Sequence, residues 1–353
     1  MDGSNGFPAE LVYSIALHLQ PIDLASLALV SRLHSAEAVR VLYRAVIISS
    51  PFSVNAFDRT ICEHADKANL VVSLDVALEN CDFQLAPLQR LRFLSAYLVG
   101  RLVCLDSLLG VQNDQLESLQ LRSHFTRTLD GPQHVALARF LHRQARIRHL
   151  MLDITIPMAH DWAKTSFDNS HLPALQSLDS HLYDITALAP GRAKHSIRVR
   201  TYLNREYLDR FLRACTSNSM RSLTLRAREY RLNRPNDGDL ATLSQVFTPL
   251  PNLEVFTIEY GEMLLEKEVL DTLPNALSWP AAPQLRDFRI AFKSGYVKTT
   301  RGYAAAGTVI FSKWRAAGAP KLEKVVIGVE GGDSCCITAD GSSSGRFPFM
   351  VVP

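Results

Sequence analysis

The sequence lacks the runs and motifs that mark several large classes of protein. No stretch reaches the roughly 18 consecutive apolar residues of a membrane span, and the first residues lack the basic start and apolar run of a secretory signal. No Asn is followed two positions on by Ser or Thr, so no glycosylation acceptor is present. The six cysteines are scattered, apart from Cys335 and Cys336, and form no disulfide framework or zinc motif. These absences predict an intracellular protein, cytoplasmic, nuclear or both, with no membrane partner.

Residue patterns for catalysis are also missing. There is no Gly-rich phosphate loop. His142 and His149 lie seven residues apart, and no third ligand for a metal is placed near them in the sequence. We therefore expect no catalytic residues, no metal site and no cofactor, and we expect that the protein is not an enzyme.

The composition is that of a folded chain with an uneven charge distribution. The 353 residues are 47% hydrophobic and 21% charged, which is typical of one or two globular domains. The net charge is only +3, but residues 192–234 carry twelve Lys and Arg against three acidic residues. Residues 254–271 carry six acidic residues against one Lys. The two stretches are either solvated faces or a recognition surface with both signs of charge.

The first forty residues have helical spacing. Pro8 suits the first turn of a helix, where its missing N–H costs nothing, and Glu10 then lies where the helix dipole favours a negative charge. Leu11, Ile15 and Leu19 follow at intervals of four and form one apolar stripe. Pro21 is expected to end this helix.

Two further short helices are predicted. Asp23 is a candidate N-cap for a helix that carries Leu24, Leu27 and Val30, and Ser31 is a candidate cap for the next. Each of the three helices is too short to be stable in water alone. They must therefore pack on one another or on something else.

The same stretch carries motif elements in a recognisable order. They are Phe7-Pro8, Glu10-Leu11, Ile15, Leu19, Asp23-Leu24, Leu27, Val30-Ser31-Arg32 and Leu42-Tyr43-Arg44-Ala45-Val46. This order resembles an F-box, the helical module that docks on the Skp-family adaptor of cullin-RING ubiquitin ligases, and the last element looks like the form common in fungal F-box proteins. Two departures are Phe7 in place of the usual Leu, and Leu33 and His34 where an aromatic residue often follows the Val-Ser-Arg element.

The resemblance implies a set of adaptor contacts within residues 1–46. The implied partners are a Skp-family adaptor and, through it, a cullin. The implied adaptor-binding residues are Pro8, Glu10, Leu11, Ile15, Leu19, Leu24, Leu27, Val30 and Ser31.

The rest of the chain repeats a unit of the form apolar-x-x-apolar-x-apolar. Successive units are about 30 residues apart, for example 31 from Leu116 to Ile147, and the segments between them have helical spacing. The alternating tail of each unit predicts a strand and each spacer a helix, so the units should stack into a parallel sheet with helices outside. Clear units start at Leu88, Leu116, Ile147, Met220, Leu253, Leu285 and Leu322, a weaker one at Val71, and degenerate ones at Leu175 and Ile197.

This pattern resembles divergent leucine-rich repeats. The expected fold class is α/β: a three-helix F-box at 1–46, followed at 47–330 by an irregular leucine-rich-repeat-like solenoid with parallel strands inside and helices outside. Residues 331–353 are predicted to be a Gly/Ser-rich tail or cap.

Strand alternation predicts which side chains leave the core. Arg198, Arg200, Tyr202, Arg226 and Arg228 should share one exposed surface, where four guanidinium groups repel unless an anion or an acidic residue lies between them. We predict that they bind an acidic or phosphorylated segment of a protein target. The alternative is a solvated basic strip without a ligand. Other residues predicted on this face are Arg92, Gln120, Arg122, His124, Met151, Asp153, His181, Thr224, Thr257, Glu259, Arg289 and Lys293.

Together these features predict a non-catalytic substrate receptor of an SCF-type ubiquitin ligase. The helices would dock on the adaptor and the repeat surface would hold an unknown protein target. One alternative is a repeat scaffold for protein–protein interaction outside any ligase, in which the helices only cap the repeats. A solenoid that binds nucleic acid through residues 192–234 is a second alternative, disfavoured by the neighbouring acidic stretch and the lack of interleaved aromatic residues.

Overall fold

The computed structural model divides the chain into two compact units. The first comprises residues 1–165 with 170–174, and the second comprises residues 166–169 with 175–353. Each unit is mixed α/β and is built on a mostly parallel sheet. The structure describes residues 8–79, 83, 85–99, 114–123, 131–154, 171–189, 195–203, 205–215, 219–227, 246–260, 279–292, 301–329, 334–340 and 343–345.

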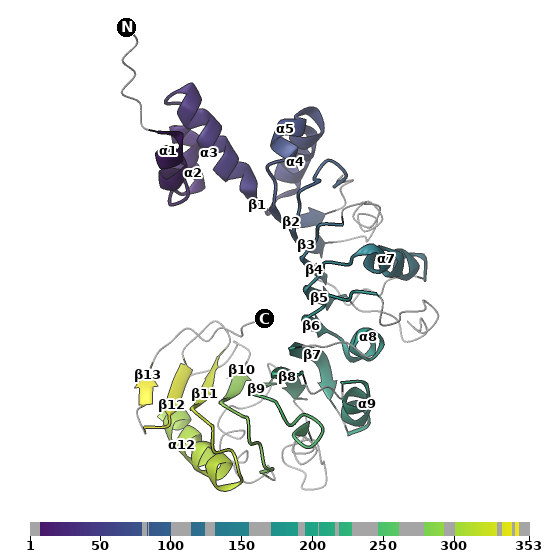
Figure 1. Ribbon diagram of the computed structural model, residues 1–353, viewed down its shortest axis with the longest axis vertical. Coiled ribbons are helices and arrows are strands. Elements are labelled where there is room, and N and C mark those ends of the chain that lie inside the picture. The colour runs from purple at the N-terminus through teal and green to yellow at the C-terminus, as the bar shows by residue number, and fades with distance from the viewer. Residues whose placement is uncertain are drawn as a thin grey trace. The chain divides into compact units, whose positions relative to one another are not determined.

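The first unit begins with three helices that pack on one another (Figure 1). They are α1 (Ala9–Ala16), α2 (Pro21–Leu27) and α3 (Arg32–Arg44). Ala16, Leu24 and Ala38 form their buried core, one from each helix, and the half-buried Leu19, Leu27, Ala28, Val41 and Leu42 pack around it. Small residues from α1 and α3 let the helices approach closely, so this short module has a core of its own.

The boundaries of these helices correct two sequence predictions. Pro21 does not end the first helix, which stops at Ala16, but is the first residue of α2, the position where a proline N–H is not missed. Asp23 is therefore not an N-cap and lies in the first turn of α2. The predicted cap at Ser31 is confirmed, because its hydroxyl accepts a hydrogen bond from the His34 N–H at 3.3 Å.

Aromatic rings connect α3 to the next elements. The helix runs directly into β1 (Ala45–Ile48), which is followed by α4 (Pro51–Glu63) and α5 (Ala65–Ala68). The Tyr43 ring stacks on Phe57 of α4 at 6.4 Å, and Phe57 stacks on Phe83 at 6.1 Å. One residue on, Arg44 donates to the Tyr13 hydroxyl of α1 at 2.6 Å. The end of α3 thus contacts both the helices before it and the layer after it.

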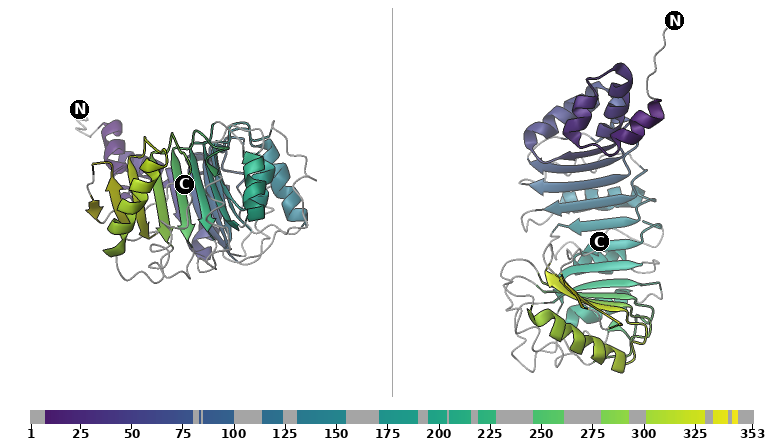
Figure 2. Two further views of the ribbon diagram at one scale, coloured as in Figure 1. Left: turned by 90° about the horizontal axis from the view of Figure 1, so that it is seen from below. Right: turned by 90° about the vertical axis from the view of Figure 1, so that its left-hand side faces the viewer.

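Five parallel strands form the sheet of the first unit in sequence order. After β1 come β2 (Ser73–Glu79), β3 (Phe93–Val99), β4 (Ser118–Ser123) and β5 (His149–Asp153). Helices α4, α5 and α7 (Gly131–Arg143) lie on one side of this sheet, and none of the helices that the structure describes lies over β2–β5 on the side turned to the viewer at the right of Figure 2.

The sheet of the second unit starts with six parallel strands and ends with two antiparallel ones. The parallel strands are β6 (Ser177–Ser180), β7 (Ser196–Leu203), β8 (Ser222–Ala227), β9 (Val255–Tyr260), β10 (Asp287–Phe292) and β11 (Lys324–Val329). Helices α8 (Leu182–Leu188), α9 (Arg205–Cys215) and α12 (Arg301–Ala316) cover one side.

The apolar positions of most sequence repeats are buried, as predicted. In the repeat that starts at Leu116, for example, Leu116, Leu119 and Leu121 are all buried. The first residue lies in the turn before the strand and the other two point inward from it, which is the outcome expected for side chains of period two.

One repeat was placed in the wrong register. The predicted start at Leu88 would bury Phe93, but Phe93 is exposed, and the buried triad is Leu91, Leu94 and Ala96. Arg92 consequently lies in the turn before β3 and not on the strand face. The error arose because LQRLRFL contains overlapping matches three residues apart, and only the pairing of β3 with its neighbours selects one.

Part of the predicted tail extends the second sheet. Strands β12 (Ser334–Thr338) and β13 (Ser343–Gly345) pair antiparallel after β11. Helix α12 packs against this addition so closely that a Cβ on Gly307 would lie 2.7 Å from Cγ1 of Ile337. The backbone of Gly307 is helical and does not itself require glycine. It is the close packing on Ile337 that favours glycine at this position.

We expect Gly307→Ala to destabilise the protein. Overpacking typically costs about 1–3 kcal/mol, which outweighs the gain of about 1 kcal/mol in helix propensity. Urea unfolding followed by circular dichroism measures the change in the free energy of unfolding.

The double variant Gly307→Ala, Ile337→Ala provides the control. Removing Cγ1 of Ile337 relieves the clash, so the double variant should be less destabilised than the sum of the two single variants. Strict additivity would contradict the proposed close packing of α12 on β12.

Candidate functional site

The helical module presents most of the predicted adaptor-binding residues on its surface. Pro8, Glu10, Leu11, Ile15, Val30 and Ser31 are exposed, and Leu19 and Leu27 are half-buried. Leu11 and Ile15 point outward because Val12 and Ala16, one residue further along α1, are the positions that face the module's interior.

Leu24 does not belong to an exposed surface. Its side chain is buried with Ala16 and Ala38 in the core of the module. It therefore holds the three helices together and is not available as an anchor for a partner. This corrects its assignment as an adaptor-binding residue.

Four further exposed apolar residues of the module were missed. Leu17, Ile22, Leu29 and Leu33 lie at the ends of the helices and in the turns between them. Sequence reasoning searched for stripes at helical spacing, and these residues lie outside the stripes. The signal that could have found them is the presence of large aliphatic residues at turn positions, which are usually polar.

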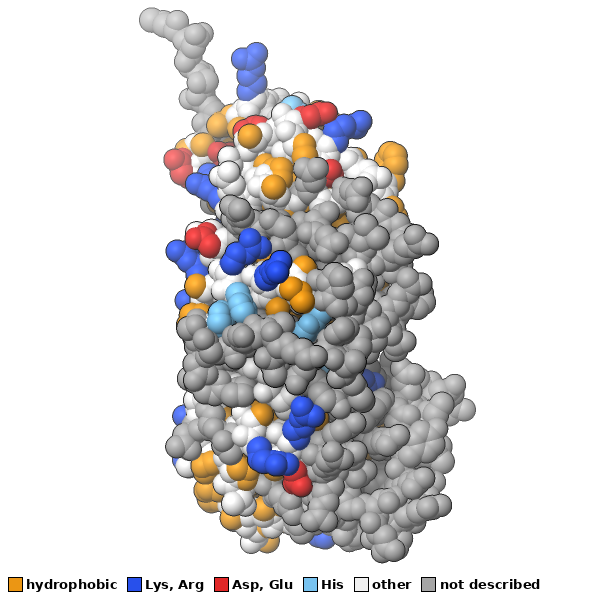
Figure 3. All heavy atoms as spheres, turned by 90° about the vertical axis from the view of Figure 1, so that its right-hand side faces the viewer, with side chains coloured by type: hydrophobic (Ala, Val, Ile, Leu, Met, Phe, Trp, Pro, Cys, Tyr) orange, Lys and Arg blue, Asp and Glu red, His pale blue; other side chains and the backbone are white. Residues whose placement is uncertain are grey.

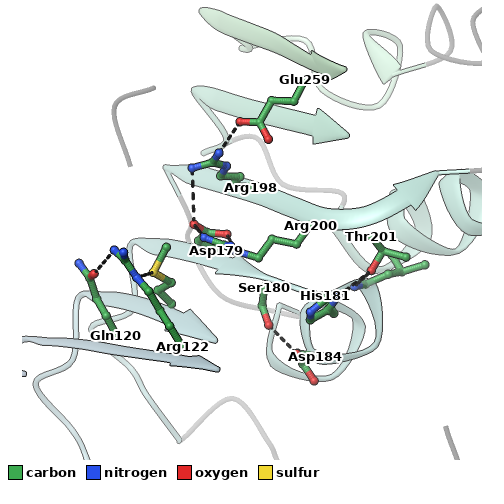
Figure 4. Close-up of polar contacts among 12 residues, drawn as sticks. Gln120, Arg122, Asp179, Ser180, His181, Asp184, Arg198, Arg200, Thr201 and Glu259 are labelled. Carbon is green, nitrogen blue, oxygen red and sulfur yellow. Dashed lines mark hydrogen bonds and ion pairs between the residues drawn. The ribbon is translucent and has the colours of Figure 1, made fainter. Parts of the chain in front are cut away.

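The predicted arginine cluster lies on the second unit's sheet, on the side opposite its buried apolar residues. Arg198 of β7 reaches across β8, where Thr224 lies beside it in the register, and places Nη2 2.6 Å from Oε1 of Glu259 on β9. On its other side, Nη1 is 3.9 Å from Oδ2 of Asp179 on β6. Figure 4 shows both contacts, and both carboxylates are buried.

Arg200 makes a two-point contact with the same aspartate. Its Nε lies 2.6 Å from Oδ1 of Asp179, and its Nη2 lies 2.8 Å from Oδ2. The register shifts after Val199, so that Tyr202 and not Arg200 is the neighbour of Arg226. Arg198 is the regular register neighbour of Asp179, whereas the shift after Val199 removes Arg200 from the side of Arg226 and so breaks a regular ladder of four arginines.

The cluster is therefore not an open site for an external anion. Arg198 and Arg200 are neutralised by carboxylates of their own sheet, and Arg226 lies beside Glu259 in the register. The side chain of Tyr202 and the whole of Arg228 lie outside the described residues. The prediction of an open cluster is wrong because the repulsion between the arginines is relieved by Asp179 and Glu259 within the same chain.

Asp179 was the residue missed here. Sequence alternation places it beside the buried Leu178, on the same face as Arg198, so its contact could have been anticipated from the register of β6 and β7. Glu259 was placed on the correct face, but a side chain that crosses an intervening strand is not visible from alternation alone.

The described residues offer little chemistry of other kinds. Within them, no group of three His, Cys, Asp or Glu side chains lies close enough to hold a metal ion. The His142 ring stacks on His171 at 3.8 Å. Burial raises the pKa of the Cys335 and Cys336 thiols, so both stay protonated near neutral pH and are poor nucleophiles.

Comparison with known proteins adds no assignment: no protein-family model matches this chain, and no curated protein matches it significantly. Among the helices that the structure describes, none is long and apolar enough to cross a membrane. The function of this chain is therefore inferred from its exposed side chains.

Removal of the Asp179 carboxylate is expected to destabilise the second unit. The variant Asp179→Ala leaves Arg198 and Arg200 partly desolvated without their shared partner, which should lower the free energy of unfolding by about 2 kcal/mol. Urea unfolding of the full chain measures this loss.

The matched control is Glu254→Ala. It removes a carboxylate 3.3 Å from Arg221, but both side chains are more than a third exposed, so the expected loss is below about 0.5 kcal/mol. Equal losses in the two variants would show that the Asp179 network contributes nothing beyond an ordinary surface ion pair.

Proposed function

We propose that this protein is a substrate-recognition subunit of an SCF-type cullin-RING ubiquitin ligase. In this proposal the helices α1–α3 dock on a Skp-family adaptor, and the sheets hold the protein target. The chain contributes no catalysis. It raises the effective concentration of the target near the ligase, which makes ubiquitin transfer intramolecular.

The distribution of exposed apolar side chains is the observation that carries the proposal. Among the described residues, nine of the twelve exposed large apolar side chains lie between Leu11 and Phe52, and seven of them belong to the three helices and their turns. Leu29 is 88% exposed and Ile22 is 76% exposed. Figure 3 shows hydrophobic side chains between charged ones at this end of the first unit.

Such a concentration is typical of a protein interface. Single exposed apolar residues are common on any surface, but many of them within one short module cost solvation free energy unless a partner covers them. The module already has a core made of Ala16, Leu24 and Ala38, so the exposed set is not needed to hold the helices together. The order of motif elements from Pro8 to Val46, which resembles an F-box, supports the adaptor as that partner.

The internal contacts of the module favour a preformed docking surface. Arg44 bonds the Tyr13 hydroxyl at 2.6 Å, and the Arg40 guanidinium lies 4.7 Å from the centre of the same ring. Both contacts tie α1 to α3. A partner would thus meet helices already in place, which lowers the entropic cost of binding.

The variants Ile15→Asp and Val30→Asp test the proposal. We expect each to weaken binding to a fungal Skp-family adaptor by about tenfold or more, because each places a charge in an apolar interface. Both residues are exposed, so the fold should be retained, as circular dichroism would confirm. Co-expression with the adaptor, followed by co-purification and calorimetric titration, measures the binding.

The matched control is Val309→Asp, the same change at an exposed position on α12 of the second unit. It should leave adaptor binding unchanged. If the wild-type chain does not bind the adaptor, or if all three variants bind as well as wild type, the ligase role is excluded. A repeat scaffold with capping helices would then be the better description.

A further inference from the structure

The face of the first sheet opposite its helices is a second candidate surface. Its side chains come from the strand positions that alternate with the buried ones, and the register places them in rows. One row is Ile47, Asp75, Ser95, Gln120 and Met151, from β1 to β5. The next is Ala77, Tyr97, Arg122 and Asp153, from β2 to β5. We call the outward residues of β1–β5 the first-unit face; the right-hand view of Figure 2 looks onto these strands.

Arg122 is the notable charge on the first-unit face. Its Nη2 donates to Oε1 of Gln120 at 2.8 Å, and its Nε points to Sδ of Met151 at 3.3 Å (Figure 4). Both acceptors are neutral. Among the described residues no carboxylate lies within ion-pair distance of Arg122, and the side chain is exposed.

This environment contrasts with that of the other arginines on the sheets. Arg198 and Arg200 each contact a buried carboxylate, so their charges are satisfied within the chain. Arg122 is held in a defined orientation by Gln120 and Met151, but neither contact neutralises its charge and neither engages Nη1. A guanidinium fixed in this way is prepared to bind an anionic oxygen without losing much side-chain entropy.

Apolar side chains lie on the same face. Tyr97 is the direct neighbour of Arg122 in the register. Phe93, four residues before Tyr97 on β3, is 40% exposed, with the Arg92 guanidinium 5.7 Å from its ring centre. At about 3.3 Å per residue along a strand, Phe93 lies roughly 13 Å from the level of Arg122. An extended peptide covers this distance in about four residues.

We propose that the first-unit face binds an extended segment of the target protein that carries a single acidic residue. An Asp or Glu of this segment pairs with Arg122, and an apolar residue about four positions away packs on Phe93. This inference rests on the proposed function, because it names the class of target that the receptor would hold.

The charges around Arg122 favour a carboxylate over a phosphate. Asp153 is the register neighbour of Arg122 on β5, about 4.8 Å away at the backbone, and Asp75 lies on the same face. These negative charges repel a phosphate group of charge close to −2 more strongly than a carboxylate of charge −1. A single arginine also balances the charge of a single carboxylate.

Selection of twelve-residue peptides from a random display library on the immobilised full chain tests the proposal. We expect enrichment of peptides with an acidic residue and an apolar residue about four positions apart. Fluorescence polarisation with one enriched peptide should show about tenfold weaker binding to Arg122→Gln, in line with the loss of a charge-assisted hydrogen bond. Phe93→Ser should weaken the same peptide, and replacing its acidic residue by Gln should have the same effect.

Arg139→Gln is the control, since Arg139 is exposed on α7, which covers the other side of the sheet. It should bind the peptide like wild type, and Arg122→Gln should keep the wild-type unfolding midpoint. Three results would overturn the inference: no acidic enrichment, binding that is unchanged in Arg122→Gln, or tighter Arg122-dependent binding of a phosphoserine peptide or an RNA oligonucleotide. Adaptor binding is measured on the same preparations to separate the two proposals. If the adaptor still binds when any of these three results is obtained, the peptide-binding inference fails and the receptor role remains intact.

Discussion

In-register pairing of strands is the constraint on which both units depend. Side chains alternate between the two faces of a strand, so a shift by one residue would exchange every buried side chain with an exposed one. The buried sets, such as Leu119 and Leu121 on β4 or Phe288 and Ile290 on β10, hold each strand in its register because exposing them would cost about 1.5–3 kcal/mol per side chain. The same register decides which polar residues become neighbours on the opposite face.

Charged residues at the turns before the strands follow the same register. Arg92 contacts Glu117, Arg221 contacts Glu254, and Arg286 contacts Glu323, each across one step of its sheet. These pairs are largely exposed and contribute little stability individually. Their alternating signs nevertheless disfavour a displaced strand, since a strand paired with the wrong neighbour would place like charges together.

Two classes of arginine therefore arise on one type of scaffold. On the second sheet, Arg198 and Arg200 meet buried carboxylates, so their positive charge stabilises the fold and is not offered to a partner. On the first sheet, Arg122 meets an amide oxygen and a thioether, and neither contact neutralises its charge. A count of basic residues along the chain draws attention to the first class, although the second class is the better candidate for recognition.

Much of the architecture followed from the sequence alone, because hydrophobic periodicity is a local property of the chain. The short helices before residue 46, the Ser31 cap, the parallel strands and most of the buried triads were determined in this way. The tertiary structure alone decided that Leu24 is a core residue of the module, that Phe93 faces outward, and that Asp179 and Glu259 neutralise the arginines of β7. These outcomes depend on residues that are distant in sequence, and it is the pairing of strands and the packing of helices that brings those residues together.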